Sequence, residues 1–226
     1  MRWPAAWKIA FAPTTTSPGW PCSCSRFRRF RRPAIVEPEG PRPSLDTERI
    51  VTTLARHGVA YVLIGGLAAV AHGSAIPTTD LDLVPDASRA NLGRLAAALR
   101  DLEAKLRVSD LPYSLDVALD NRAFDAFTTA AFRTPYGDVD VVLRPDAGGP
   151  RRHFTYEELN ARADSREAFG VTIRVAALDD IVESKAAAGR PQDLIALPHL
   201  AALRAALAQD DAAPGAAPDL EPPEPG

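Results

Sequence analysis

Three segments of the chain have the hydrophobic pattern of β-strands, one as an apolar run and two by strict alternation. The run VAYVLIGG, residues 59–66, is a short apolar stretch that ends in two glycines and predicts a buried strand. Residues 78–85, TTDLDLVP, alternate strictly, so Leu81 and Leu83 face one side of a strand while Asp80 and Asp82 face the other. Residues 138–145, DVDVVLRP, repeat this alternation. Weaker strand signals lie at 115–120, 130–137 and 171–178.

Helical periodicity fills the segments between these strands. The first helix is expected to end near His57, with Ser44 or Asp46 as its cap, and Ser88 is the expected cap of a helix that reaches Arg107. Further helices are expected over residues 67–73, over 155–163 with a capping box to Glu158, over 178–189, and over 190–207, where Pro198 predicts a break into a helical pair. The pattern predicts an α/β (α+β) fold, with a small mixed sheet flanked by helices and followed by C-terminal helices.

Composition sets the expected domain boundaries. The 226 residues include 21 prolines, most of them in residues 1–43 and 212–226. We therefore expect a disordered or wrongly assigned tail over 1–43, a domain over 44–208 whose helical part covers 177–208, and a disordered tail over 209–226. The basic run RFRRFRR, residues 26–32, belongs to the first tail and is interpreted as disordered.

Charge and cysteine content narrow the classes of function. The net charge of −3 predicts no general attraction to nucleic acid, so a polynucleotide would need a local patch. Candidate members of such a patch are Arg133, Arg144, Arg151, Arg152 and Arg190. Cys22 and Cys24 are the only cysteines, and no run reaches the roughly 20 apolar residues of a membrane span, so a cytoplasmic protein without a membrane partner is expected.

The candidate chemistry lies between Gly65 and Asp82. Two carboxylates at i and i+2 project from the same face of a strand, where they can share a divalent cation such as Mg²⁺. The pair Gly65-Gly66 ends the preceding strand and lets the backbone approach a phosphate closely. Asp140, between two valines, supplies the third carboxylate that two-metal phosphoryl transfer needs, with Asp138 as the competing candidate. A single alternating strand with acidic residues indicates a face exposed to solvent. The glycine pair, the Asp80–Asp82 pair and Asp140 together favour a site for metal and phosphate.

The same residues resemble a known superfamily. Gly65-Gly66, the later Asp80-Leu81-Asp82-Leu83 and Val139-Asp140-Val141 look like the signature of the nucleotidyltransferases, which share the fold of DNA polymerase β. The segments 65–86 and 178–200 resemble more narrowly the AbiEii-type nucleotidyltransferases, which include toxins of bacterial toxin-antitoxin systems.

The resemblance implies roles for individual residues. Asp80, Asp82 and Asp140 would be metal ligands, with Asp140 also orienting or deprotonating the attacking hydroxyl. Gly65, Gly66 and Thr78 would contact the nucleotide triphosphate; Lys185 resembles a phosphate-binding lysine, and Asp193 the acid that follows it. Ile76 stands where relatives often carry arginine, a departure that predicts weaker nucleotide binding, altered nucleotide orientation or lost activity, with Arg190 and Arg144 as candidate substitutes.

The resulting hypothesis is a Mg²⁺-dependent nucleotidyltransferase that moves NMP from an NTP to an acceptor hydroxyl. The resemblance favours a tRNA 3′ end as acceptor and a cognate antitoxin as protein partner. Proteins or aminoglycoside-like small molecules are the alternative acceptors. A catalytically weak nucleotide-binding module, supported by Ile76, is the alternative from another functional class.

Overall fold

The structure is a computed structural model that describes residues 41–108, 111–149 and 152–212. All of these residues belong to one unit of the chain, Glu37–Gly226. The predicted tail features, namely the basic run, the two cysteines and the last residues, lie outside the described part, as does Arg151. No helix within the described ranges is long and apolar enough to cross a membrane.

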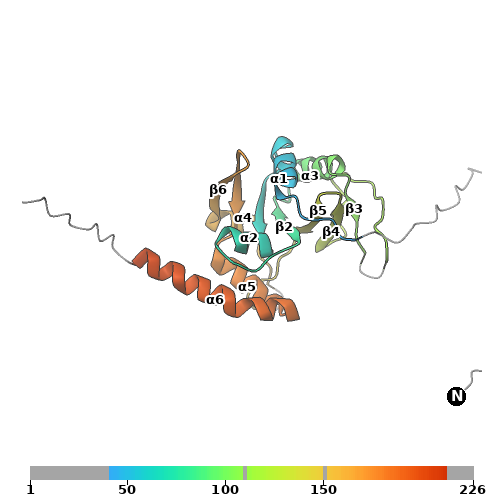
Figure 1. The fold of residues 1–226 in the computed structure, drawn as a ribbon. Helices are drawn as coiled ribbons and strands as arrows, with labels where there is room; N and C mark the ends of the chain where they lie inside the picture. Colours follow the sequence, from blue (N-terminus) through green and yellow to red (C-terminus); the bar gives the residue numbers. More distant parts are fainter. Residues whose placement is uncertain (1–40, 109–110, 150–151, 213–226) are drawn as a thin grey trace, which may run out of the picture. The chain divides into compact units, whose positions relative to one another are not determined.

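Helices and strands are interspersed along the described part of the chain (Figure 1). The strands are β1 (Tyr61–Ile64), β2 (Asp80–Pro85), β3 (Lys105–Leu106), β4 (Thr129–Thr134), β5 (Gly137–Val142), β6 (Asp164–Ala168) and β7 (Val171–Val175). The helices are α1 (Thr47–Arg56), α2 (Gly65–Ala71), α3 (Arg89–Asp101), α4 (Tyr156–Arg162), α5 (Leu178–Ala188) and α6 (Pro191–Ala212).

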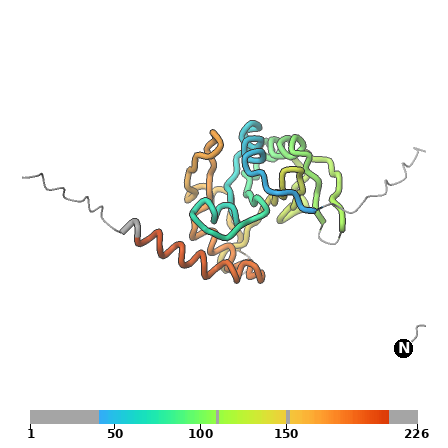
Figure 2. Tube along the Cα trace, viewed as in Figure 1, coloured from blue at the N-terminus to red at the C-terminus, as the bar shows by residue number. Residues whose placement is uncertain are grey.

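In the described part of the chain, seven strands form one sheet in the order β3-β4-β5-β2-β1-β7-β6. The sheet is mixed, because β2 runs parallel to β5 and β1 parallel to β7, while the other neighbouring pairs are antiparallel. The predicted α/β class, a mixed sheet flanked by helices with further helices at its C-terminal side, is therefore confirmed. The central strands β2 and β5, distant in sequence, lie side by side (Figure 2).

Local sequence explains where the helices begin. The side chain of Asp46 accepts a hydrogen bond from the backbone N–H of Arg49 and caps α1, and Ser88 caps α3 in the same way. Thr155 and Glu158 form the predicted capping box of α4. Helix α2 begins at Gly65, two residues earlier than predicted.

Two helix predictions are wrong. The helix expected to reach Arg107 ends at Asp101, because Glu103 takes a left-handed backbone conformation and the chain then enters β3. Pro198 does not divide the last helix, since α6 is continuous from Pro191 to Ala212. Pro198 is exposed and Leu194, whose carbonyl loses its helical partner there, is 56% exposed, so solvent can satisfy that carbonyl.

Two strand predictions differ from the structure: one predicted strand is absent, and one observed strand was not predicted. Residues 115–120 form no strand apart from a single bridge between Leu115 and Leu106. Strand β6, with the sequence DSREA, was not predicted because it has no apolar alternation. Its position at the edge of the sheet, where one side has no strand neighbour, explains why a charged sequence is tolerated there.

The two faces of β2 and β5 have opposite character. Leu81, Leu83, Val139 and Val141 are fully buried and belong to the hydrophobic core with residues of α1 and α3. Asp80, Asp82, Asp138 and Asp140 alternate with them and therefore share the opposite face. The pleat of the sheet thus gathers four carboxylates at its centre.

Candidate active site

Asp82 and Asp140 occupy the centre of the site. They are register partners on the parallel strands β2 and β5, and Asp80 pairs in the same way with Asp138. Neighbouring strands are about 4.8 Å apart, so register partners on one face bring their side chains close together. The structure therefore brings together the three acids that the sequence singled out.

Burial and mutual repulsion disturb the ionisation of two of these acids. Burial raises the pKa of Asp82 to about 7, and the carboxylates of Asp80 and Asp140 add to this effect, while Lys185 and Arg190 oppose it. Burial likewise raises the pKa of Asp140 to about 6, despite the opposing charge of Arg107. Carboxylates whose pKa values stay raised beside these cations indicate a place where a further cation would be stabilised.

Asp80 is held by a neighbouring hydroxyl. Thr78 Oγ1 donates a hydrogen bond to Asp80 Oδ1 over 2.6 Å, which fixes the carboxylate at the start of β2. Thr78 was predicted to contact nucleotide, and it does line a cleft, but its observed contact is with the acid. Its place in the site is therefore beside Asp80.

The two glycines leave room for these acids. A Cβ atom on Gly65 would lie 2.0 Å from Asp82 Oδ2, and Gly65 has a φ of +74°. A Cβ atom on Gly66 would lie 2.6 Å from Thr78 Oγ1. The Gly65-Gly66 pair is thus required for the start of α2 to pack against Asp82 and Thr78, whatever further contact it makes with phosphate.

Asp138, the competing candidate, is occupied by arginines. Its side chain is 0% exposed, and its oxygens lie 3.1 Å from Arg42 Nε, 2.9 Å from Arg107 Nη1 and 3.0 Å from Arg133 Nε. A buried carboxylate with such partners is stabilised as an ion and is not available to a substrate. Asp140 Oδ1, in contrast, is buried and accepts no hydrogen bond within the described residues.

Two cations face the carboxylates from the C-terminal helices. Lys185 on α5 and Arg190, between α5 and α6, both contact Asp193, with Lys185 Nζ 2.9 Å from Oδ1 and Arg190 Nε 2.6 Å from Oδ2. The Asp193 side chain is only 1% exposed. Burial acts to raise the pKa of Asp193, but the hydrogen bonds from Arg190 and Lys185 outweigh it and lower that pKa. Asp193 therefore fixes two cations at the wall of the second cleft.

Two adjoining clefts meet at this cluster. Asp82, Asp140, Lys185 and Arg190 line both of them. The first cleft has a volume of about 210 Å³, and its lining combines charged residues with the apolar side chains of Ile64, Val142 and Ile181. The second has a volume of about 560 Å³ and polar walls that include Thr78, Thr79 and Arg107. Together they offer a surface suited to a ligand with an apolar part and an anionic part.

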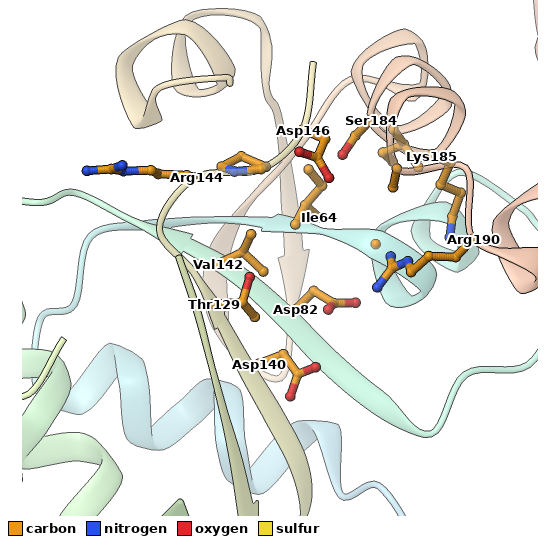
Figure 3. A pocket seen from close by; sticks show the side chains of 14 residues that line it. Ile64, Asp82, Thr129, Asp140, Val142, Arg144, Asp146, Ser184, Lys185 and Arg190 are labelled. Atoms are coloured by element: carbon orange, nitrogen blue, oxygen red, sulfur yellow. The ribbon is translucent and has the colours of Figure 1, made fainter. Parts of the chain in front are cut away.

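Figure 3 shows the first cleft from close by. The carboxylates of Asp82 and Asp140 lie next to each other, and the Arg190 side chain reaches toward Asp82. Arg144 extends away from both acids, so of the two proposed substitutes for an arginine at position 76, only Arg190 lies against the carboxylates. Ile76 itself lines the second cleft.

The carboxylates of the site could supply part of the coordination shell of a magnesium ion. Within the described ranges, no three His, Cys, Asp or Glu side chains form a ready metal cluster. Mg²⁺, however, commonly uses one or two protein carboxylates and completes its shell with water and substrate phosphates. Asp82 and Asp140, with raised pKa values and an oxygen on Asp140 that accepts no hydrogen bond within the described residues, meet that requirement, and Asp80 is the adjacent third acid.

Sequence reasoning missed two residues of the site. Arg42 was assigned to the tail, and Arg107 was assigned to a helix, yet both line the second cleft. Their positive charge is the only feature of the sequence that could have indicated a place in the site. The predicted basic patch is scattered, because Arg152 lies near Glu158 and Glu183, and Arg133 is bound to Asp138.

Comparisons with known proteins find similarity only among solved structures. No protein-family model matches the chain, and the search of curated proteins finds no match. A lincomycin-bound lincosamide adenylyltransferase, LnuA, has a TM-score of 0.47 at 14% identity, over 71% of this chain and 99% of that one. A structure of ANT(2″)-Ia with adenylyl-2″-tobramycin has a TM-score of 0.41 at 15% identity, over 72% and 95%.

A third structure, of a putative nucleotidyltransferase from Thermotoga maritima, has a TM-score of 0.42 at 15% identity, over 74% of this chain and 97% of that one. The first of these names describes an adenylyltransferase and the third a nucleotidyltransferase. At TM-scores below 0.5, these similarities define neither the family nor the reaction of this chain.

Proposed function

We propose that this protein is a Mg²⁺-dependent nucleotidyltransferase that transfers NMP from an NTP to an acceptor hydroxyl. The observation that carries the proposal is the pairing of Asp82 with Asp140 across two parallel strands, opposite Lys185 and Arg190. Acids on one wall and cations on the other suit a polyphosphate that is partly neutralised by metal.

The acids have distinct roles in this proposal. Asp80, Asp82 and Asp140 would hold the metal, which supplies positive charge at the phosphate oxygens when bound. Asp140, whose pKa of about 6 leaves it ionised at neutral pH, accepts the proton of the acceptor hydroxyl. The hydroxyl oxygen then bonds to the α-phosphorus, and the bond from that phosphorus to pyrophosphate breaks.

The cations and the apolar cleft position the nucleotide. Lys185 and Arg190, fixed by Asp193, neutralise the phosphates, and Gly65 and Gly66 keep the backbone close to them. The apolar side chains that line the first cleft accept the base or ribose. Catalysis in such a site is mainly positioning and charge neutralisation.

The finer identity of the reaction rests on the family resemblance. By that resemblance, the acceptor is a tRNA 3′ end and the protein acts as an AbiEii-like toxin with a cognate antitoxin. The alternative acceptors are proteins and aminoglycoside-like small molecules. Incubation of the purified protein with each α-³²P-labelled NTP and Mg²⁺, in the presence of tRNA, a protein extract or tobramycin, identifies the acceptor from the species that becomes labelled.

A nucleotide-binding module without turnover is the second candidate. It is favoured by Ile76, which puts an apolar side chain on the wall of the second cleft. Calorimetry that detects binding of NTP with Mg²⁺, together with no release of pyrophosphate in the presence of any of the three acceptor pools, would select this candidate over the enzyme.

A further inference from the structure

Arg107 reaches the acids of β5 from the far side of β4. Its backbone N–H donates to the carbonyl of Ala131 over 2.8 Å, so Arg107 continues the pairing of β3 with β4. Ala131 is the register partner of Asp140, and Arg133 is the register partner of Asp138. Register partners share a face of the sheet, and the small side chain of Ala131 leaves room for Arg107 to cross β4. Arg107 therefore meets both acids of β5.

The guanidinium of Arg107 contacts the two acids unequally. Its Nη1 lies 2.9 Å from Asp138 Oδ2, which is a hydrogen-bond distance, but 3.7 Å from Asp140 Oδ1, which is too long for one. Asp140 Oδ1 is buried and accepts no hydrogen bond within the described residues. A movement of the guanidinium by about 1 Å would bring it to hydrogen-bond distance from that oxygen. Arg107 is therefore bound to Asp138 and kept just away from Asp140.

Asp138 holds Arg107 as one of three arginine partners. Its side chain is 0% exposed, and Arg42 Nε and Arg133 Nε approach its oxygens to 3.1 and 3.0 Å. Such partners keep a buried carboxylate ionised, so Asp138 remains a strong acceptor for the Arg107 guanidinium. An arginine is always charged, and one that paired fully with Asp140 would compete with a metal ion for the same oxygen. The pairing with Asp138 avoids that competition.

We propose that Asp138 is a positioning residue that holds Arg107 away from Asp140 and so keeps Asp140 Oδ1 available to a divalent cation. This inference rests on the proposed function, in which Asp140 is a metal ligand, and adds the residues that keep this ligand available. Without the carboxylate of Asp138, the Arg107 guanidinium would pair with Asp140 instead. Metal binding would then fall although every ligand was still present. If Asp138 supported only the fold, metal binding in its variants would not depend on Arg107.

The test measures metal binding to the full chain and does not need turnover. The probe is Mn²⁺, which suits the same oxygen ligands as Mg²⁺, and free Mn²⁺ is quantified by electron paramagnetic resonance with Mg²⁺ as competitor. Titrations compare wild type with Asp138→Asn and Arg107→Gln. They also include two double variants, in which Asp138→Asn is combined with Arg107→Gln or with Arg42→Gln. Thermal melts verify that each variant is folded.

Asp180 provides a matched control for loss of a buried, arginine-bound carboxylate. Its side chain is 6% exposed and lies 2.9 Å from Arg162 Nη2, and it lines neither cleft of the site. Asp180→Asn therefore removes the same kind of ion pair at a distance from the proposed metal ligands. Its Mn²⁺ affinity should equal that of wild type.

Asp138→Asn is expected to lower the affinity for Mn²⁺ about tenfold. Adding Arg107→Gln should restore it to within about threefold of wild type, because the competing cation is then gone. Adding Arg42→Gln should not restore it, since the polar contacts of Arg42 in the described part of the chain are with Asp138 and Thr79. Arg107→Gln alone should raise the affinity about threefold, because it removes a positive charge beside the metal ligand. This last variant tests the inference even if Asp138→Asn does not fold.

Three results would overturn the inference and leave the proposed function standing. Wild-type affinity in Asp138→Asn would show that Asp138 does not protect the metal ligand. Failure of Arg107→Gln to restore affinity in the double variant would show that Asp138 does not act through Arg107. A lower affinity in Arg107→Gln alone would show that Arg107 supports the metal site. A wild-type protein that binds no Mn²⁺ would instead contradict the metal site of the proposed function, and this inference with it.

Discussion

Asp82 on β2 lies directly opposite Asp140 on the parallel strand β5, and Asp140 Oδ1 is buried without a hydrogen-bond donor among the described residues. Burial raises the pKa of both carboxylates; Asp80 and Asp140 add to the effect at Asp82, and Asp80 and Asp138 add to it at Asp140. The arrangement costs stability in the metal-free protein and becomes favourable when a cation is bound. Several properties of the protein follow from this one relationship.

The stability of the metal-free protein should depend on the ionisation of Asp82. Its pKa is raised from 3.8 to about 7 in the folded state, so the fold favours the protonated acid. The stabilising contribution is therefore fully present below the unfolded-state pKa and is lost as pH rises through the folded-state value. Urea unfolding should be measured in EDTA from pH 4 to pH 8. As pH rises across this range, the free energy of unfolding of Asp82→Asn should increase relative to that of wild type by about 1–3 kcal/mol. An equal difference at all pH values would contradict the electrostatic account.

Magnesium should stabilise the wild-type protein through the same acids. A ligand that binds only the folded state at ten times its dissociation constant contributes about 1.4 kcal/mol, which is a rise in melting temperature of about 3–5 °C for a domain of this size. The rise at pH 8 should disappear in Asp82→Asn and in Asp140→Asn. The exposed acid Asp116 offers the matched control Asp116→Asn, which should keep the full shift. A shift that survives in both site variants would place the metal elsewhere.

Substitution of Gly65 by alanine should destabilise the protein through a clash with Asp82. Gly170 serves as the comparison that separates this clash from backbone strain. Gly65 and Gly170 have φ angles of +74° and +73°, but only at Gly65 would a Cβ atom meet another group, Asp82 Oδ2 at 2.0 Å. Gly170→Ala therefore reports the backbone strain alone, about 1 kcal/mol. Gly65→Ala should cost roughly 1–3 kcal/mol more in urea unfolding and should also displace Asp82, with loss of the Mg²⁺ shift. Equal costs at the two sites would show that the contact with Asp82 is unimportant.

Asp193 should act through the cations that it holds. It contacts Lys185 and Arg190, is buried, and lines the second cleft, so Asp193→Asn should loosen both cations. The KM for NTP should rise about tenfold, with a smaller effect on kcat, because nucleotide binding is what the pair supports. The double variant Asp193→Asn with Lys185→Gln should be little worse than either single variant. Asp179→Asn, which removes the exposed pair with Arg204 between the same two helices, is the control and should leave KM unchanged.

The sequence predicted most of the sheet and most of the acidic cluster. Strict alternation in β2 and β5 identified which residues share a face, and that information alone places Asp80 and Asp82 together. It did not provide the pairing of Asp82 with Asp140, because strand order and register depend on tertiary packing. The three arginines that pair with Asp138 favour Asp140 over Asp138 as the third acid of the proposed site.

The residues that sequence reasoning missed are those without a local pattern. Arg42 lies in proline-rich sequence that composition assigns to a tail, and Arg107 follows a helix whose apolar period runs past its true end at Asp101. Each becomes part of the site only through contact with Asp138, at least 31 residues further along the chain. The role of Asp193 as the partner of two cations was hidden for the same reason, because it requires the turn between α5 and α6.

Transfer of label from an α-³²P-labelled NTP in the presence of Mg²⁺ and the acceptor pools tests the central claim most directly. Wild-type protein is predicted to label an acceptor and release pyrophosphate. Asp82→Asn and Asp140→Asn, folded by thermal melt, are predicted to lose at least about a hundredfold in rate, while Asp116→Asn stays at the wild-type value. Undiminished transfer in both site variants would contradict the assignment of the paired aspartates as the reacting centre.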